Sequence, residues 1–272
     1  MYEMFYKLSF KAIREHFLKH KDCNFIFVDW SKGSVNHYWT ATANTRIVGA
    51  EIALFLQKVI VSKYFNVDKS QIHLLGHSLG SHIIGYAGQR LSGLRRLTGN
   101  NEEKRNAVCS IIPALDPADP FFEGGQPEIR IDPTDGDFVD AWHTDGRQLM
   151  PNLMNGLGMW DPVGHADIYV NGGISQPTCG SLKPALVLFE TVGEKNPFHL
   201  GKDVICCHHQ YVLKLLAVSY FSSENCIPVA YQCDTYSDFL RGAMTINYSK
   251  CIYFRHEYLR SSKMDTKLLS AH

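Results

Sequence analysis

The chain has 272 residues, 45% of them hydrophobic, and its 27 lysine and arginine residues balance its 27 aspartate and glutamate residues. The balanced charge, without a basic stripe, argues against nucleic acid as a partner, and no uncharged apolar stretch is long enough to span a bilayer. No repeat and no linker rich in proline, serine or glycine divides the chain, so we expect a single domain over residues 1–272.

Helices and strands are predicted to alternate in the first part of the chain. Ser9 can cap a helix with apolar residues at helical spacing, and the apolar run at residues 25–28 predicts a strand. A second helix is predicted to open at Asn44, and residues 71–75 form a further predicted strand.

The alternation continues towards the C-terminus. Strands are predicted at residues 128–132, 138–143 and 166–170, and a helix is predicted at about residues 209–221. Buried strands that alternate with helices indicate an α/β fold with a mainly parallel sheet, whose active site lies at the carboxyl ends of the strands.

The pentapeptide at residues 76–80, GHSLG, follows the predicted strand 71–75 and precedes a helix-like run at residues 81–91. A strand that turns sharply into a helix holds a serine out of the fold beside a base, and flanking glycines keep the turn free of clashing Cβ atoms. The helix N-terminus then points backbone N–H groups at the developing oxyanion. The strand and helix context carries the argument, because the pentapeptide alone also occurs by chance. Ser78 is therefore the predicted nucleophile.

The acid and the base of a catalytic triad should follow Ser78 in the order Asp, His. Asp116 comes directly after an apolar segment and precedes a proline, which is expected to hold it extended. Asp119 also precedes a proline but lies further into the loop, where a turn role is the simpler interpretation. His209 stands out among the thirteen histidines because it opens a predicted helix directly after a cysteine. A disulfide at that cysteine could fix the position of His209.

Six of the eight cysteines fall in the last hundred residues, which is typical of a disulfide-bonded protein made in an oxidising compartment. The N-terminus nevertheless has no uninterrupted apolar region like that of a signal peptide. A zinc site in the sequence CCHH at residues 206–209 is the alternative. It is disfavoured, because four adjacent residues cannot all converge on one tetrahedral ion.

Together these residues resemble the animal neutral lipases, the pancreatic lipase family that includes the phospholipases A1. The resemblance covers about residues 17–251, and it implies an α/β-hydrolase fold with the triad Ser78, Asp116 and His209. His208 and the pair Gln210–Tyr211 replace residues that are usual beside the base. The motifs that carry the resemblance are VDW at 28–30, GHSLGSH at 76–82, LDPADP at 115–120, HTDG at 143–146, VGHAD at 163–167, NGG at 171–173, and CHH at 207–209 with Ser219 ten residues later.

The resemblance further implies a disulfide between Cys179 and Cys207 at the foot of a lid formed by about residues 180–206. Such a lid covers an apolar acyl-chain cleft in water and opens when a lipid surface offers its apolar face a better environment. A long surface loop with one buried patch is the alternative. Cys233 and Cys251 resemble a second disulfide pair of the family.

Residues 127–135 resemble the family's structural calcium loop. In that interpretation Asp132 and Asp135 would supply side-chain oxygens, and Glu128 or Arg130 would supply backbone carbonyls, a ligand set that suits a hard cation. The spacing from Glu128 to Asp132 is one residue shorter than the commonest pattern, and an acidic turn without metal is the alternative. No cofactor is expected to be required for the chemistry.

The chain also departs from the family. Nothing before Val28 matches the strand with a His-Gly-Phe-type turn that gives the second oxyanion donor, so the Leu79 N–H is the one donor identified. The chain is therefore expected to be N-terminally truncated and nearly inactive as it stands. Residues 100–114 form an insertion where relatives run almost directly on. The chain stops soon after Cys251, without the C-terminal β-sandwich, so a colipase-like partner is not expected.

The leading hypothesis is a secreted serine carboxylester hydrolase that acts on lipid esters at a lipid aggregate or membrane surface. The segments 146–164 and 180–206 resemble the long loops of the triacylglycerol lipases, which predicts a preference for triacylglycerol with phospholipase A1 activity as a side reaction. A catalytically silent lipid-binding homologue and an incomplete fragment that folds poorly are the alternatives.

Overall fold

A computed structural model of the chain describes residues 10–15, 17–19, 22–35, 37–60, 67, 69, 72–91, 111–146, 156–177, 179, 206–216, 230–233, 235–242 and 252–254. Several predictions fall outside these residues, namely the helix cap at Ser9, the insertion up to residue 110, the lid residues 180–205, Ser219 and Cys251. Among the helices of the described ranges, none has the length and apolar character needed to cross a membrane.

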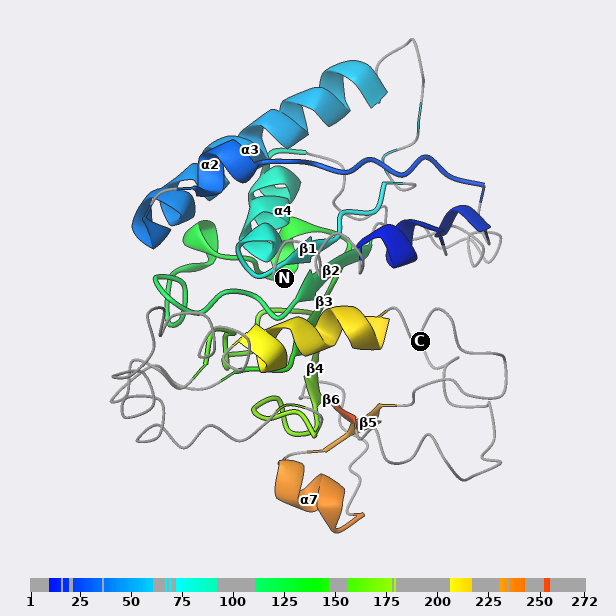
Figure 1. Cartoon of the computed structure of the whole chain (residues 1–272), viewed down its shortest axis with the longest axis vertical. Coiled ribbons are helices and arrows are strands. Elements are labelled where there is room, and N and C mark those ends of the chain that lie inside the picture. Colours follow the sequence, from blue (N-terminus) through cyan, green and yellow to red (C-terminus); the bar gives the residue numbers. More distant parts are fainter. Residues whose placement is uncertain are drawn as a thin grey trace, which may run out of the picture.

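A sheet with the strand order β1-β2-β3-β4-β6-β5 forms the centre of the described structure (Figure 1). Strands β1 to β4 and β6 run parallel, and β5 pairs antiparallel with β6. The predicted, mainly parallel α/β arrangement is confirmed. The strands are β1 (Gly76–His77), β2 (Ile111–Leu115), β3 (Phe138–His143), β4 (Ala166–Val170), β5 (Tyr231–Gln232) and β6 (Ile252–Phe254).

Helices cover both faces of the sheet (Figure 1). On one face, α3 (Tyr38–Phe55) packs on α4 (Leu79–Arg90), and a short π-helix, η1 (Leu56–Ile60), continues α3. A helix through residues 206–216 covers the other face. Residues 10–15 and 17–19 are also helical, as predicted for the first helix, and pack on the same cluster as the helix through 206–216. Two short helices lie elsewhere, α2 (Ser31–Ser34) before α3 and α7 (Tyr236–Leu240) near β5.

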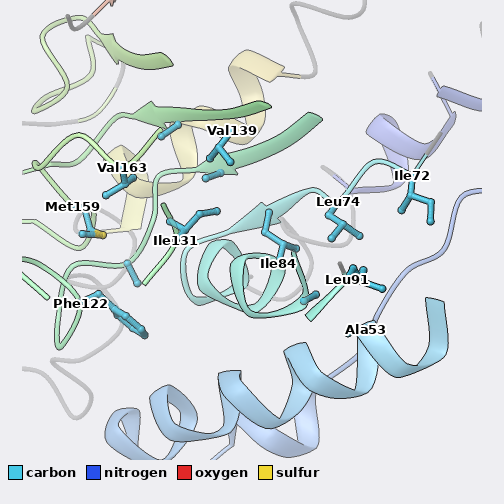
Figure 2. Packing of buried hydrophobic residues seen from close by; sticks show 14 of the residues in the cluster. Ala53, Ile72, Leu74, Ile84, Leu91, Phe122, Ile131, Val139, Met159 and Val163 are labelled. Carbon is cyan, nitrogen blue, oxygen red and sulfur yellow. The ribbon is translucent and has the colours of Figure 1, made fainter. Parts of the chain in front are cut away.

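The alternation of side chains along the strands gives each face of the sheet its own core. Ala114 of β2 belongs to the cluster formed with α3 and α4, which Figure 2 shows packed around Ile84. The next residue, Leu115, belongs to the cluster on the opposite face, where it meets Val212 and Leu213 of the helix through 206–216. This second contact places the start of that helix beside the end of β2.

Two of the predicted strands are confirmed as β3 and β4, and three are wrong or displaced. The apolar run at 25–28 pairs with no described strand: residues 26–28 are exposed, and Phe25 is partly buried against the second cluster. Residues 72–75 are irregular up to the short strand β1. The segment 128–132 forms a 3₁₀ turn, η4 (Pro127–Ile129), instead of a strand. Pro127, the first residue of η4, has no N–H to donate to a neighbouring strand. The Ile129 carbonyl instead accepts a hydrogen bond from Tyr86 Oη at 2.5 Å.

A further correction concerns the expected insertion at residues 100–114. Its last residues form β2, a central strand that pairs with β1 and β3 on its two sides, so this part is built into the sheet. The helix expected from Asn44 begins earlier, at Tyr38, because the Asn44 side chain donates to the Gly33 carbonyl at 2.8 Å instead of capping. The last predicted helix is already helical at residue 206, the first described residue before His209.

Candidate active site

Ser78 stands at a strained turn between β1 and α4. Its backbone has φ 58° and ψ −125°, a conformation that is costly for a residue with a side chain and that clusters at functional sites. Its N–H donates to the Leu115 carbonyl at 3.0 Å, which fixes the turn to the end of β2. A Cβ on Gly76 would lie 2.2 Å from the Gly80 carbonyl oxygen, whereas a Cβ on Gly80 would meet no described atom within 4 Å. Both glycines were predicted to be needed to avoid a Cβ clash, but only a Cβ on Gly76 would clash. Leu79 is the first residue of α4, where backbone N–H groups lack partners inside the helix.

Asp116 and His209 form a buried hydrogen-bonded pair. His209 Nδ1 donates to Asp116 Oδ2 at 2.6 Å, and both side chains are almost fully shielded from solvent. The other carboxylate oxygen accepts the backbone N–H groups of Thr144 at 2.7 Å and Asp145 at 3.1 Å. Asp116 directly follows β2, but its φ of 44° shows that it is left-handed and not extended, as the following proline had led us to expect.

His77 links the nucleophile turn to this pair. His77 Nε2 donates to the His209 carbonyl at 2.9 Å, and the two rings lie 4.7 Å apart. Burial, helped by the neighbouring His209, lowers the pKa of His77 to about 3, so the ring is neutral. Ser78 is thus next in sequence to a residue that touches the base, and its amide binds the residue before Asp116. No described hydrogen bond joins the Ser78 hydroxyl to His209, a contact that in many catalytic sites tightens only with substrate bound.

This geometry agrees with the comparison with known proteins. The pattern of the Lipase family matches residues 7–268, nearly the whole chain. The chain belongs to the lipase family. The expected resemblance to the pancreatic lipases and the expected α/β-hydrolase fold are thereby confirmed.

Three relatives illustrate the similarity. The chain is 46% identical to mouse pancreatic triacylglycerol lipase over 157 residues, which cover 57% of this chain and 30% of that protein. It is 37% identical to rat pancreatic lipase-related protein 2 over 218 residues, 79% of this chain and 41% of that protein. It is also 37% identical to mouse inactive pancreatic lipase-related protein 1 over 219 residues, 80% of this chain and 41% of that protein. The chain spans less than half the length of these relatives.

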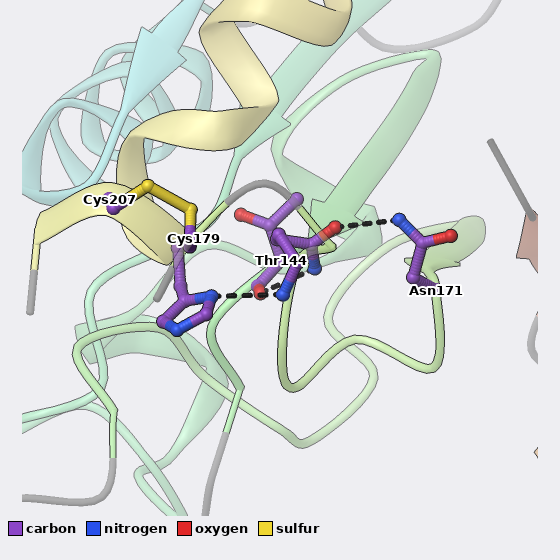
Figure 3. The surroundings of a disulfide bond; sticks show 6 residues. Thr144, Asn171, Cys179 and Cys207 are labelled. Atoms are coloured by element: carbon purple, nitrogen blue, oxygen red, sulfur yellow. Dashed lines mark hydrogen bonds between the residues drawn. A yellow bond between two sulfur atoms is a disulfide. The ribbon is translucent and has the colours of Figure 1, made fainter. Parts of the chain in front are cut away.

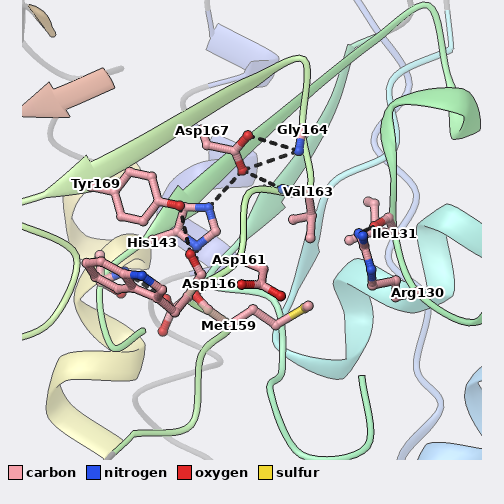
Figure 4. A network of polar contacts seen from close by, with 12 residues as sticks. Asp116, Arg130, Ile131, His143, Met159, Asp161, Val163, Gly164, Asp167 and Tyr169 are labelled. Carbon is pink, nitrogen blue, oxygen red and sulfur yellow. Dashed lines mark hydrogen bonds and ion pairs between the residues drawn. The ribbon is translucent and has the colours of Figure 1, made fainter. Parts of the chain in front are cut away.

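A second buried histidine, His143, lies near the candidate triad acid of this lipase-family chain (Figure 4). His143 stacks on Tyr169, its Nε2 binds Asp167 Oδ1 at 2.9 Å, and its Nδ1 binds the Met159 carbonyl at 2.8 Å. Burial lowers the pKa of His143, but the hydrogen bond and the charge of Asp167 raise it more, so the net shift is upward. Both ring nitrogens face acceptors, so the protonated form of the ring can donate to Asp167 and to the Met159 carbonyl at once.

The His143–Asp167 pair holds the backbone of residues 158–164, and Gly158 of this segment lies next to Asp116. Asp167 also accepts the N–H groups of Val163 and Gly164, and the neighbouring Gly158 faces the triad carboxylate. A Cβ on Gly158 would lie only 2.5 Å from Asp116 Oδ1. These supporting roles were not predicted from the sequence, although the motifs HTDG and VGHAD contain His143 and Asp167.

Asp119, the rival candidate for the acid, lies away from the base in an acidic group with Glu123 and Asp161. Its side chain is 1% exposed, and its Oδ2 has no hydrogen-bond partner among the described residues. Burial, together with the charges of Glu123 and Asp161, raises its pKa to about 7. The structure therefore pairs Asp116, and not Asp119, with His209.

The predicted disulfide between Cys179 and Cys207 is present (Figure 3). It closes a loop of 28 residues and anchors the helix through residues 206–216 two positions before His209. Residues 180–205, the predicted lid, lie outside the described residues, so the lid stays a prediction. The same holds for the second disulfide pair, because Cys251 also lies outside them.

The predicted calcium loop is a tight acidic turn. Asp132 Oδ1 accepts the Thr134 N–H at 2.6 Å, and Asp135 Oδ2 accepts the Asp132 N–H at 2.9 Å, which makes a reciprocal cap for η5 (Pro133–Asp135). Glu128 is exposed, and the Arg130 guanidinium donates to carbonyls of its own loop. No group of three or more potential metal-binding side chains occurs in the described part of the chain. Both carboxylates accept backbone N–H groups, so an acidic turn without metal explains the described contacts. Calcium binding stays a prediction.

Proposed function

We propose that this chain is a serine carboxylester hydrolase that cleaves acyl esters of lipids. The observation that carries the proposal is the buried hydrogen bond of 2.6 Å between His209 and Asp116, at the same edge of the sheet as the strained Ser78 turn. A base that a carboxylate orients, next to a serine hydroxyl, is the arrangement that activates serine. Membership of the lipase family supports the same reaction.

In this mechanism His209 Nε2 removes the Ser78 Oγ proton as the oxygen attacks the ester carbonyl carbon. The carbonyl π electrons move to oxygen, and the resulting oxyanion faces the N-terminus of α4, where the Leu79 N–H is the candidate donor. Asp116 stays ionised and stabilises the imidazolium. Collapse of the intermediate expels the alcohol, which takes the proton from His209. Water then attacks the acyl-enzyme with His209 as base and releases the fatty acid.

The proposed substrates are long-chain acylglycerols presented at a lipid surface, with phospholipase A1 activity as a side reaction. The 46% identity to a mouse pancreatic triacylglycerol lipase supports the preference, as do the lengths of the segments 146–164 and 180–206. Longer loops enlarge the apolar cover and narrow the access of a charged head group. The disulfide and the pancreatic relatives support a secreted protein.

The experiment compares the wild type with Ser78→Ala on a soluble short-chain ester and on vesicles. We expect the substitution to abolish hydrolysis, since the attacking atom is lost, while binding to lipid vesicles is unchanged. Equal and measurable turnover by the two proteins would rule out the serine mechanism. Parallel rates on emulsified triolein and phosphatidylcholine test the substrate preference, which a faster rate on phosphatidylcholine would contradict.

A catalytically silent lipid-binding homologue is the second candidate. It is favoured by the relative at 37% identity that is named as inactive, and by the lack of a second oxyanion donor identified in the sequence. Vesicle binding without ester turnover in the wild type would select this function over the hydrolase.

A further inference from the structure

Gln176 joins the two halves of the candidate triad through its side chain and its backbone. It is 2% exposed and lies between β4 and the disulfide at Cys179. Every polar group of this residue has a partner. Its Nε2 donates to the carbonyls of Thr144 at 2.7 Å and Val170 at 3.0 Å, its Oε1 accepts Asn171 Nδ2 at 2.8 Å, its N–H donates to His208 Nδ1 at 2.9 Å, and its carbonyl accepts the Cys179 N–H at 3.0 Å.

Towards Asp116, Gln176 holds a peptide unit that donates a hydrogen bond to the Asp116 carboxylate. The Thr144 carbonyl and the Asp145 N–H belong to one planar peptide group. Gln176 Nε2 donates to the carbonyl end of this group, and the N–H end donates to Asp116 Oδ1 at 3.1 Å. A hydrogen bond to the carbonyl fixes the plane and polarises its N–H, which strengthens the bond at the other end. Figure 3 shows Thr144 and Asn171 near the disulfide between Cys179 and Cys207.

On the base side, Gln176 holds the start of the helix that carries His209. Its N–H binds the ring of His208, the residue immediately before the base, and its carbonyl binds the N–H of Cys179. Cys179 is in turn bonded to Cys207. The segment 176–179 is thus fastened to residues 207 and 208 at two points, and this helix start is where the base stands.

We propose that Gln176 is a positioning residue that sets the Asp116–His209 hydrogen bond by holding both partners from one buried amide. The proposal deepens the hydrolase function and rests on it for its catalytic consequence. A glutamine is required, because two donors and one acceptor are used at once: glutamate lacks the donors, and methionine lacks all three polar groups. Small displacements of a triad are costly, since misplacement by about 1 Å reduces rates by about 100-fold.

The test uses Gln176→Glu and Gln176→Met in the full chain, with Gln126→Met as the control, because Gln126 is exposed on a distant loop. The first readout is kcat and KM on a soluble short-chain ester. The second is the downfield proton NMR signal of the His209–Asp116 hydrogen bond, assigned by its loss in His209→Gln. The buried His143–Asp167 pair supplies a second downfield signal in the same spectrum, which reports whether the surrounding fold is intact.

In both Gln176 variants we expect kcat to fall by about tenfold or more, with KM within about threefold of the wild type. The His209 signal should shift upfield or broaden while the His143 signal stays, and Gln126→Met should behave as the wild type. An unchanged His209 signal with kcat within twofold would overturn the proposal. Loss of both histidine signals would also overturn it, because Gln176 would then be needed by the whole fold. A wild type without turnover, whose His209 signal still responds to Gln176, would refute the hydrolase function and leave the positioning role standing.

Discussion

Replacing Gly158 by alanine tests the placement of the triad acid with a single methyl group. The new Cβ would lie 2.5 Å from Asp116 Oδ1 and 2.7 Å from both Cγ and Oδ2, although real Cβ contacts essentially never fall under 3.0 Å. The carboxylate must therefore retreat from 2.5 Å to at least 3.0 Å, a displacement of about 0.5 Å or more. Gly158 has no positive φ, so its backbone accepts alanine without strain, and the clash with the carboxylate is the main effect.

The displacement acts on three short hydrogen bonds at once, those that join Asp116 to His209, Thr144 and Asp145. Overpacking of this kind costs roughly 1–3 kcal/mol of stability. The catalytic cost should be larger, and we expect kcat on a soluble ester to fall about 10- to 100-fold with KM nearly unchanged.

The matched control is Gly80→Ala, the same chemical change at a glycine of the nucleophile pentapeptide whose Cβ would meet no described atom within 4 Å. It lies inside α4, where alanine is favoured over glycine by roughly 0.5–1 kcal/mol, so activity should be kept and stability should rise. The reasoning would be refuted if Gly158→Ala kept kcat within twofold of the wild type, or if Gly80→Ala lost as much activity as Gly158→Ala.

Three further outcomes are expected. Gly76→Ala should abolish soluble expression or activity, because its Cβ would sit 2.2 Å from a backbone oxygen that cannot move aside; an active, stable variant would contradict the geometry of the turn. Cys207→Ser should lower the free energy of unfolding by about 3–4 kcal/mol, the chain-entropy value for a loop of 28 residues, and equal denaturation midpoints for variant and wild type would contradict this. Asp119→Asn should stabilise the protein increasingly as the pH rises from about 4 to about 7, because the folded pKa of about 7 lies above the ordinary value of 3.8 and the stability that the protonated acid contributes is lost through that window. A pH-independent difference in melting temperature would show that the carboxyl is not buried as described.

The nucleophile turn could be predicted from the sequence because its chemistry is local. A serine between two glycines after an apolar run gives one geometry, and the structure has the strained backbone at Ser78 that this geometry requires. Asp116 and His209 are 93 residues apart in the sequence. Their pairing was predicted from the order of the motifs, because hydrophobic periodicity gives no information about such distant contacts.

The wrong strand predictions have one physical cause: a local sequence pattern does not determine which strand a segment pairs with. The apolar run at 25–28 has strand composition but no described strand partner, whereas residues 111–114, assigned to an insertion, gain two neighbouring strands and lie at the centre of the sheet. The roles of Gln176 and His143 depend on backbone carbonyls contributed by distant loops. No composition or spacing rule predicts such contacts, so they emerged only with the fold.

The central claim is that Ser78 is a nucleophile activated by the Asp116–His209 pair. Its most direct test is to treat the folded protein with an alkyl fluorophosphonate, which forms a covalent bond only with an activated serine, and to map the adduct by peptide mass spectrometry. We predict one stoichiometric adduct on Ser78, formed at a rate that falls steeply in His209→Gln. An adduct on another serine, or labelling of Ser78 at the same rate without His209, would contradict the account.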